Sequence, residues 1–398
     1  MPSLRPPPSY SPTLIAAKPE SRRHLASAPA KIAPGPRAIE FNLVIESPPL
    51  ICYGSRDSST GALLSGLLFL YVNAYAVPMK SVTLDLVQEI SFRRPSSPAC
   101  KPCINQVNVL KHWDLLSHDT VLSRSEYGYP FSHLLPGDSP ASTSSALVGI
   151  SYHLRAVAVP LAKDVAPIDL TRSISVFRSV PSTDVRRCLR IFPPTSLNVT
   201  ASLPAVCFPK SEFTLNLRVN NLVNKEKRTR WTMRKFNWTL NETCKLKAVA
   251  CDKHISSAVP LEDVRLISSG DLRRGWKTDY SGDGEIEMEV PISTFTDDIS
   301  IPAACDALVP DLGFSVEHSL VVEILVSEEY VPVGAHFAPS PTGAARILRM
   351  KFGVDLTERG GLGIAWDDEV PPTYNDVPIS PPGYDYLDSN QDVEHLVM

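Results

Sequence analysis

Apolar and polar residues alternate at a period of two in segment after segment of this 398-residue chain. Because successive side chains of a β-strand point to opposite faces, this period is typical of half-buried strands. The clearest examples are residues 39–45, 82–86, 148–154, 213–219 and 286–292. Proline outnumbers glycine by 37 to 19, which disfavours long helices and favours turns and strand edges. We therefore predict an all-β fold.

One segment interrupts this pattern. Between residues 108 and 118, Val109, His112, Trp113 and Leu116 recur at intervals of three and four residues. That spacing places them on one face of a helix, so it predicts a single short helix here.

The strands fall into two groups, which predicts two tandem immunoglobulin-like β-sandwich lobes. The first lobe is expected at residues 38–180 and the second at 185–355, with a hinge at 179–184. Residues 1–37 are rich in proline, alanine and serine without periodicity, and residues 356–398 end in prolines and acidic side chains. Both termini are predicted to be disordered tails, because they hold too little apolar surface to form a core.

One uncharged stretch has the length of a membrane span. No residue between Asp57 and Lys80 is charged, so a single-pass protein crossing through residues 58–79 is one interpretation. The stretch also holds serine, threonine, glycine and Pro78, and we favour a buried β-strand with its turns. No signal sequence opens the chain, so its eight cysteines are expected in a reducing cytosol.

The motif Pro-Pro-x-Tyr occurs three times, once near the N-terminus and twice near the C-terminus. Prolines held near the polyproline II conformation dock on the aromatic groove of a WW domain, and the tyrosine ring fills a second pocket. The C-terminal copies start ten residues apart. Three copies in the tails support WW-domain binding more strongly than one copy would. The predicted WW-binding residues are Pro7, Pro8, Tyr10, Pro371, Pro372, Tyr374, Pro381, Pro382 and Tyr384.

A dense basic run lies in the second lobe, with two tryptophans among its charges. Its members are Lys225, Lys227, Arg228, Arg230, Arg234 and Lys235. We predict that the run binds membrane cargo or an anionic lipid surface, since each basic group near such a membrane contributes about 1 kcal/mol. The alternative is a solvated hairpin whose tryptophans enter the core. Nucleic acid is not expected as a partner, because the net charge of the chain is −4.

Cys100 and Cys103 have the spacing of two zinc ligands, but a single pair needs two more. His112 with His118, or Cys188 with Cys207, would complete a site only if the fold brought them near. The alternative is a loop that holds two buried thiols, and we predict no resident metal or cofactor.

Catalytic motifs are not found in the sequence, and we predict that the chain is not an enzyme. Asp279, Ser281, Asp283 and Gly284 imitate the start of a calcium-binding loop. The twelfth position, which requires a glutamate, is Val290, so a hairpin turn is the better interpretation.

Several segments carry longer motifs. They are 45–54 (IESPPLICYG), 61–66 (GALLSG), 100–103 (CKPC), 113–116 (WDLL), 129–137 (YPFSHLLPG), 151–156 (SYHLRA), 192–195 (FPPT) and 230–238 (RWTMRKFNW). Together these motifs resemble the fungal α-arrestins, the arrestin-related trafficking adaptors, over roughly residues 39–355. Tyr129 stands where the family has the first phenylalanine of its FPFSxxLPG motif.

The resemblance implies arrestin-like lobes that bind a plasma-membrane transporter or permease as cargo. It implies tails that recruit a WW-domain HECT ubiquitin ligase, so that the cargo is ubiquitinated and internalised by endocytosis. It also implies a cytoplasmic protein that is recruited to the plasma membrane and to endosomes or the Golgi. The alternative is an arrestin-fold sorting scaffold of the retromer type that recruits no ligase.

Overall fold

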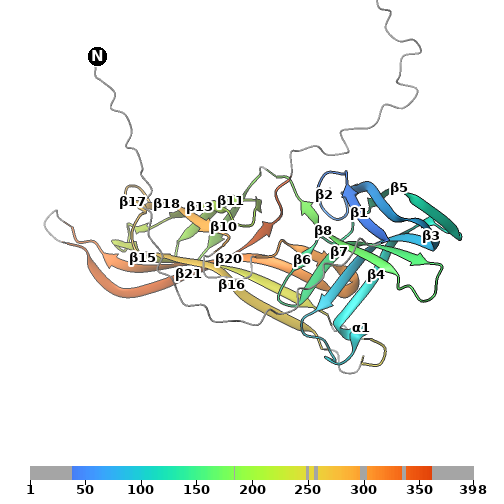
Figure 1. Ribbon diagram of the computed structural model, residues 1–398. Coiled ribbons are helices and arrows are strands. Elements are labelled where there is room, and N and C mark those ends of the chain that lie inside the picture. The colour runs from blue at the N-terminus through green and yellow to red at the C-terminus, as the bar shows by residue number, and fades with distance from the viewer. Residues whose placement is uncertain are drawn as a thin grey trace, which may run out of the picture. The chain divides into compact units, whose positions relative to one another are not determined.

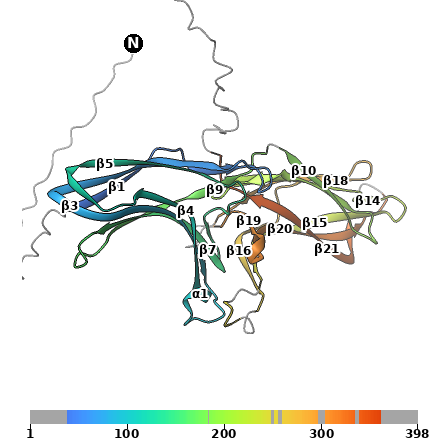
Figure 2. The same ribbon diagram turned by 90° about the vertical axis from the view of Figure 1, so that its right-hand side faces the viewer.

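A computed structural model describes residues 38–182, 184–247, 251–254, 259–295, 303–333 and 338–360. Within these residues the fold is nearly all β, as predicted, and every paired strand joins a partner from its own lobe (Figures 1 and 2). The two predicted tails lie almost entirely outside the described residues.

The first lobe contains one large sheet, one small parallel sheet and one short helix. Its elements are β1 (Ile39–Ile45), β2 (Leu50–Tyr53), β3 (Ala62–Phe92), α1 (Lys101–Ile104), β4 (Asn105–Leu116), β5 (Thr120–Leu135), β6 (Thr143–Ser144), β7 (Val148–Pro160), β8 (Ile168–Ile174) and β9 (Val176–Ser179). Strand β3 organises the large sheet. Its first half pairs with β1 and β5, and its second half pairs with β4 and β7.

Most of the uncharged stretch at 58–79 forms the first half of β3, which begins at Ala62. From Ala62 to Val72 its residues alternate between buried and half-buried, with Leu64, Leu68 and Leu70 in the core. The single-pass interpretation is therefore wrong for this stretch, because it forms a strand of a sheet whose buried side chains pack into the first lobe's core. Among the described residues, no helix combines the length and the apolar character needed to cross a membrane.

The predicted helix at 108–118 is also wrong, because these residues continue β4. This strand pairs antiparallel with β3, and Trp113 lies opposite Leu84. The register of the pair shifts twice, and each bulge resets the alternation of side chains. The apolar residues therefore recur at helical spacing although the backbone is extended.

Two glycines of the sequence motifs allow loops of the first lobe to approach each other closely. A Cβ on Gly61, where φ is +103°, would lie 2.0 Å from the carbonyl oxygen of Leu135. A Cβ on Gly137 would lie 1.8 Å from the carbonyl oxygen of Ser59. Only glycine permits these approaches, and Arg178 on β9 donates a hydrogen bond to the Gly137 carbonyl at 2.5 Å.

The second lobe is a sandwich of two sheets. The five-stranded sheet has the order β10 (Val185–Ile191), β11 (Asn198–Pro204), β13 (Glu212–Asn220), β18 (Glu285–Ser293), β17 (Lys277–Asp279). The facing sheet has the order β12 (Val206–Cys207), β21 (Ser340–Leu356), β20 (Phe314–Tyr330), β15 (Thr229–Leu246), β14 (Val223–Asn224), with β16 (Leu261–Leu272) on β15 and β19 (Ala307–Val309) on β20. A short 3-10 helix, η2 (Pro310–Leu312), connects β19 to β20.

The calcium-like segment is the turn between β17 and β18. Gly284 adopts a φ of +76° there, and its N–H donates to the Ser281 carbonyl at 2.9 Å. The hairpin interpretation of this segment is confirmed.

Each lobe has its own core, and the first core extends into the second lobe. Residues near the ends of β15 and β20, among them Cys244, Leu246, Phe314 and Val316, belong to the core of the first lobe. The second lobe also extends past the predicted boundary at 355, because Leu356 and Thr357 are buried. Thr357 accepts a hydrogen bond from the Val180 N–H at 3.1 Å, which ties the end of β21 back to the first lobe.

Candidate functional site

The basic run lies in the turn that follows β14 and on the first half of β15. Four of its six members have an acidic partner from another part of the lobe. The pairs are Lys225 with Asp283 (3.1 Å), Arg230 with Glu329 (3.0 Å), Arg234 with Glu329 (2.6 Å) and Lys235 with Asp271 (3.6 Å). Much of the positive charge that the sequence predicts is therefore compensated.

Glu329 on β20 is the centre of this group. Its side chain is 12% exposed and accepts hydrogen bonds from Arg230 and Arg234. Burial raises the pKa of Glu329, but the hydrogen bonds and the positive charges of the two arginines outweigh it, so the pKa lies below its usual value. The Arg230 guanidinium also stacks over the Tyr280 ring at 4.2 Å. These arginines therefore have a structural role.

Lys227 and Arg228 differ from their neighbours. Both are exposed at the turn between β14 and β15, where Arg228 has a φ of +54°. Within the described residues neither has an acidic partner.

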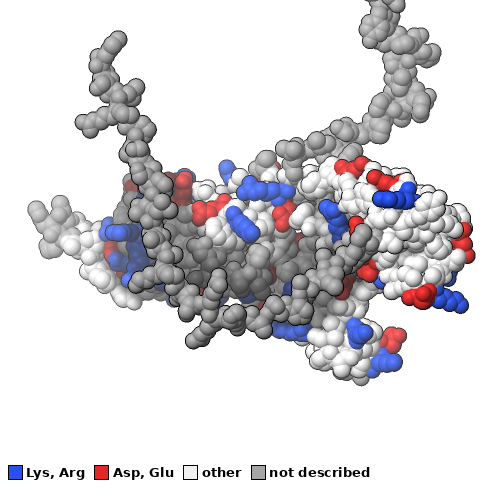
Figure 3. All heavy atoms as spheres, in the orientation of Figure 1, with Lys and Arg blue, Asp and Glu red and all other residues white. Residues whose placement is uncertain are grey.

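Trp231 is buried in the core of the second lobe, which agrees with the hairpin interpretation. The visible face in Figure 3 likewise shows basic and acidic side chains interspersed.

The nine predicted WW-binding residues lie outside the described residues. The geometry of the three Pro-Pro-x-Tyr motifs therefore remains a prediction.

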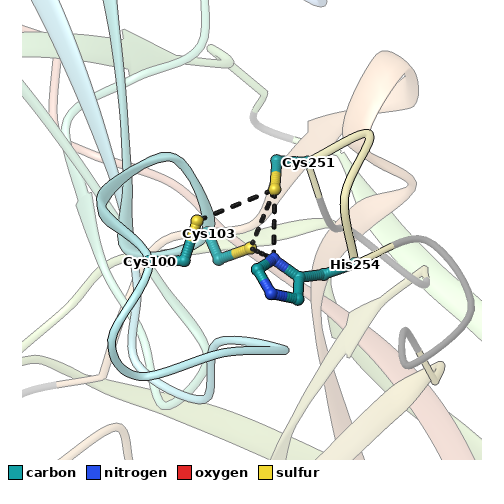
Figure 4. A group of neighbouring side chains, drawn as sticks. All are labelled: Cys100, Cys103, Cys251 and His254. Carbon is teal, nitrogen blue, oxygen red and sulfur yellow. Dashed lines mark hydrogen bonds between the residues drawn. The ribbon is translucent and has the colours of Figure 1, made fainter.

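The structure brings Cys100 and Cys103 together with two residues that the sequence interpretation missed, Cys251 and His254 (Figure 4). The Cys251 sulfur lies 3.7 Å from that of Cys100 and 3.6 Å from that of Cys103. Nδ1 of His254 lies 3.5 Å from the Cys103 sulfur and 3.2 Å from the Cys251 sulfur. The hydrogen bond with His254 lowers the pKa of the Cys251 thiol to about 6.

Neither pair of additional ligands considered from the sequence joins Cys100 and Cys103 in the structure. His112 lies on β4 with its Nδ1 2.5 Å from Asp85 and its Nε2 3.1 Å from Asp114. Cys188 is on β10 and Cys207 on β12, in the second lobe's opposite sheets. His118 is likewise outside the group that surrounds Cys100 and Cys103. The missed signal was the segment Cys251-Asp-Lys-His254, which repeats the spacing of the Cys100–Cys103 pair.

A second titratable group is buried where β15, β16 and β20 meet. Glu242 is 0% exposed and accepts two hydrogen bonds from Arg265, at 2.7 and 2.9 Å, and one from the Ala304 N–H at 2.9 Å. His318 lies between Glu242, 3.4 Å away, and Asp306. Burial raises the pKa of Glu242, but its hydrogen bonds with His318 and Arg265 outweigh this effect, and the pKa falls to about 2.

The chain is similar to several known proteins. A family model, LDB19, described as arrestin N-terminal like, matches residues 82–258. An uncharacterized protein of Schizosaccharomyces pombe is 34% identical over 354 residues, which cover 87% of this chain and 89% of that protein. The LDB19 proteins of Eremothecium gossypii and Saccharomyces cerevisiae are 26% and 24% identical, over 87% and 79% of this chain and 82% and 68% of their own lengths.

Proposed function

Because this chain belongs to the LDB19 family of arrestin-related proteins, we propose that it is a trafficking adaptor for ubiquitin-dependent endocytosis. Its arrestin-like lobes bind a plasma-membrane transporter or permease, and its tails recruit a WW-domain HECT ubiquitin ligase. The adaptor itself carries out no chemistry, because the ligase supplies the reactive centre.

The observation that carries this proposal is the pair of Pro-Pro-x-Tyr motifs that follow the arrestin-like lobes. The last described strand, β21, ends at Leu356, and the first of the two motifs begins at Pro371. A motif outside the lobes can bind a WW domain without disturbing the fold, so cargo binding and ligase binding are separable.

The exposed turn at Lys227 and Arg228 is the part of the basic run that supports cargo or lipid binding. Lys225, Arg230, Arg234 and Lys235 are occupied by acidic partners within the lobe. Lys227 and Arg228, which have no acidic partner among the described residues, form a small positive projection that suits an acidic cytosolic segment of a transporter or an anionic headgroup. We propose that they assist docking and that the lobes' other surfaces supply most of the cargo specificity.

A cytoplasmic location with recruitment to the plasma membrane, endosomes or Golgi follows from the same proposal. All eight cysteines are free thiols, which is compatible with a reducing compartment.

Cargo ubiquitination in cells tests the proposal. The triple variant Tyr10→Ala, Tyr374→Ala, Tyr384→Ala loses the ring that fills the second pocket of each WW domain. We expect the variant to bind cargo as the wild type does, and the cargo to remain unmodified at the cell surface.

Tyr386→Ala is the matched control, because this tyrosine lies two residues after the last motif and outside it. It should behave as the wild type. Normal cargo ubiquitination and internalisation in the triple variant would exclude ligase recruitment through these motifs and would favour the retromer-type scaffold.

A further inference from the structure

Two short turns, one from each lobe, present side chains of the same spacing to one point. In the first, at α1, the Cys103 N–H donates to the Cys100 carbonyl at 3.0 Å. In the second, between β15 and β16, the His254 N–H donates to the Cys251 carbonyl at 2.8 Å. Each turn therefore places its first and fourth side chains on one side. Figure 4 shows the two pairs pointing toward one another.

The distances among these side chains match a tetrahedral zinc site. Zinc binds thiolate sulfur at about 2.3 Å and imidazole nitrogen at about 2.0–2.1 Å, so its ligands lie about 3.5–3.8 Å apart. Two sulfur–sulfur distances are 3.7 and 3.6 Å, and the nitrogen–sulfur distances are 3.5 and 3.2 Å. All four ligand atoms lie within 4.8 Å of one another.

Two simpler explanations fit less well. A disulfide has a sulfur–sulfur bond of about 2.05 Å and uses only two cysteines, whereas three free thiols and an imidazole converge here. Burial of thiols as small hydrophobic groups does not explain the group either. Cys103 is buried, but Cys100, Cys251 and His254 are only half-buried.

We propose that Cys100, Cys103, Cys251 and His254 bind one structural Zn²⁺ that fastens the loop after β3 to the connection between β15 and β16. Three thiolates and an imidazole are soft or borderline ligands, which select zinc over magnesium or calcium. Four protein ligands leave no position for water or substrate, so the site is structural. The proposal departs from the sequence-based prediction that the chain needs no resident metal.

The charge of such a site is moderate. Three thiolates and one Zn²⁺ sum to −1, and each turn carries a lysine, Lys101 in the first and Lys253 in the second. Both lysines are exposed, so they reduce the net charge of the site without entering its coordination sphere.

The metal would add a link between the lobes at this point. Nearby, Arg94 and Asp263 form an ion pair of 2.7 Å, but the Arg94 side chain is 55% exposed, and such pairs contribute little. The proposed zinc joins residues that are 148 positions apart in sequence. In both views, α1 lies beside the described part of the connection between β15 and β16, residues 251–254 (Figures 1 and 2). The site therefore fixes these two loops relative to each other.

Metal analysis of the purified full-length chain tests this proposal. We expect about one zinc per chain after expression in zinc-replete medium, measured by inductively coupled plasma mass spectrometry. Cys251→Ser and His254→Ala should each lower that content to below about one-tenth. Cys188→Ser is the matched control, because this half-buried cysteine of β10 lies outside the group, and it should keep one zinc.

Two further measurements keep the proposal testable if a variant folds poorly. His254→Cys creates a four-thiolate site and should retain zinc. Titration of the metal-stripped wild type with Co²⁺ should give the intense visible bands of tetrahedral coordination with thiolate charge transfer. Chelation of the zinc should raise amide hydrogen exchange in residues 100–104 and 251–254, and leave β13 and β18 unchanged.

Any of three results would overturn the proposal. The first is a folded wild type that holds less than about one-tenth of a zinc ion per chain and gives no tetrahedral cobalt spectrum. The second is a Cys251→Ser variant that keeps its full zinc content, and the third is a disulfide between Cys251 and Cys100 or Cys103 in protein purified without oxidant.

Discussion

Strand β15 carries charged clusters near both of its ends, and the two clusters differ in their exposure to water. Near Thr229 the cluster is partly exposed, since the side chains of Arg234, Arg230 and Glu329 are 46%, 25% and 12% exposed. Near Leu246 the cluster around Glu242 lies beside the first lobe's core, and the Glu242 side chain is 0% exposed. Both clusters pair arginine with glutamate across neighbouring strands.

The same kind of ion pair therefore contributes differently to stability at the two ends of β15. An exposed pair gains little, because water screens it. A buried pair is costly to break, because the remaining charge is left without water or a partner. Substitutions at the Glu242 end should therefore report on stability, and those at the Lys227 end should report on binding.

Glu242→Gln should give the largest loss of stability. The change leaves the Arg265 guanidinium and His318 without their shared anion, and breaking a buried pair costs about 3–5 kcal/mol. Urea unfolding of the full-length chain measures the loss. Glu317→Gln is the control, because Glu317 pairs with Lys245 on the same two strands but is 62% exposed. Equal losses in the two variants would contradict the comparison.

The pH dependence of unfolding should also come from the buried end. The pKa of Glu242 is about 2, below its ordinary 4.5, so its stabilising contribution is lost as pH falls below 4.5. Burial lowers the pKa of His318, but Asp306 and Glu242 together raise it above its ordinary 6.5. The contribution of His318 is complete below pH 6.5 and is lost as pH rises through the raised pKa.

Thermal unfolding between pH 3 and 9 should therefore show greatest stability between about pH 4.5 and 6.5. His318→Asn should remove the decline on the alkaline side. An unchanged alkaline decline in that variant would contradict the assignment.

Much of this fold follows from local sequence, because alternation is a local property. Segments 213–219 and 286–292 are strands with the predicted buried faces. The prediction failed at β4 because its two bulges depend on pairing with β3. A bulge is fixed by the partner strand, so a single segment cannot reveal it.

The site residues were harder to predict for the same reason. The spacing of Cys100 and Cys103 is a local signal, but their neighbours Cys251 and His254 meet them only through the docking of two lobes. The basic run was visible in sequence, whereas its acidic partner Glu329 lies 99 positions from Arg230. Local charge density therefore overestimated the free positive charge.

Arg230→Ala should give an intermediate loss of stability, about 1–2 kcal/mol, because it removes two charge-assisted hydrogen bonds to one carboxylate oxygen of Glu329 and the stacking on Tyr280. Arg228→Ala removes an exposed side chain and should change stability by less than about 0.5 kcal/mol. Differential scanning calorimetry of the two variants measures both losses of stability. A larger loss for Arg228→Ala would show that the turn, not the Glu329 cluster, holds this end of β15.

The smallest stability effect is expected for Lys227→Glu combined with Arg228→Glu. Both side chains are exposed and have no acidic partner among the described residues, so the melting temperature should stay nearly unchanged. Binding to vesicles with anionic lipids should fall, since each lost basic group removes about 1 kcal/mol of attraction. Undiminished vesicle binding would show that this turn does not contact lipid.

If the chain couples its arrestin-like lobes to a ligase through its C-terminal motifs, as we propose, both motifs should contribute to the binding of a tandem-WW protein. Ten extended residues span roughly 30 Å, enough for both motifs to reach adjacent WW domains. Calorimetric titration of a tandem-WW protein with the wild-type chain, Tyr384→Ala and Tyr386→Ala measures the coupling. Tyr384→Ala should lower the apparent affinity about a hundredfold, and Tyr386→Ala should not. Equal affinities for the wild type and Tyr384→Ala would contradict the coupling of the two motifs.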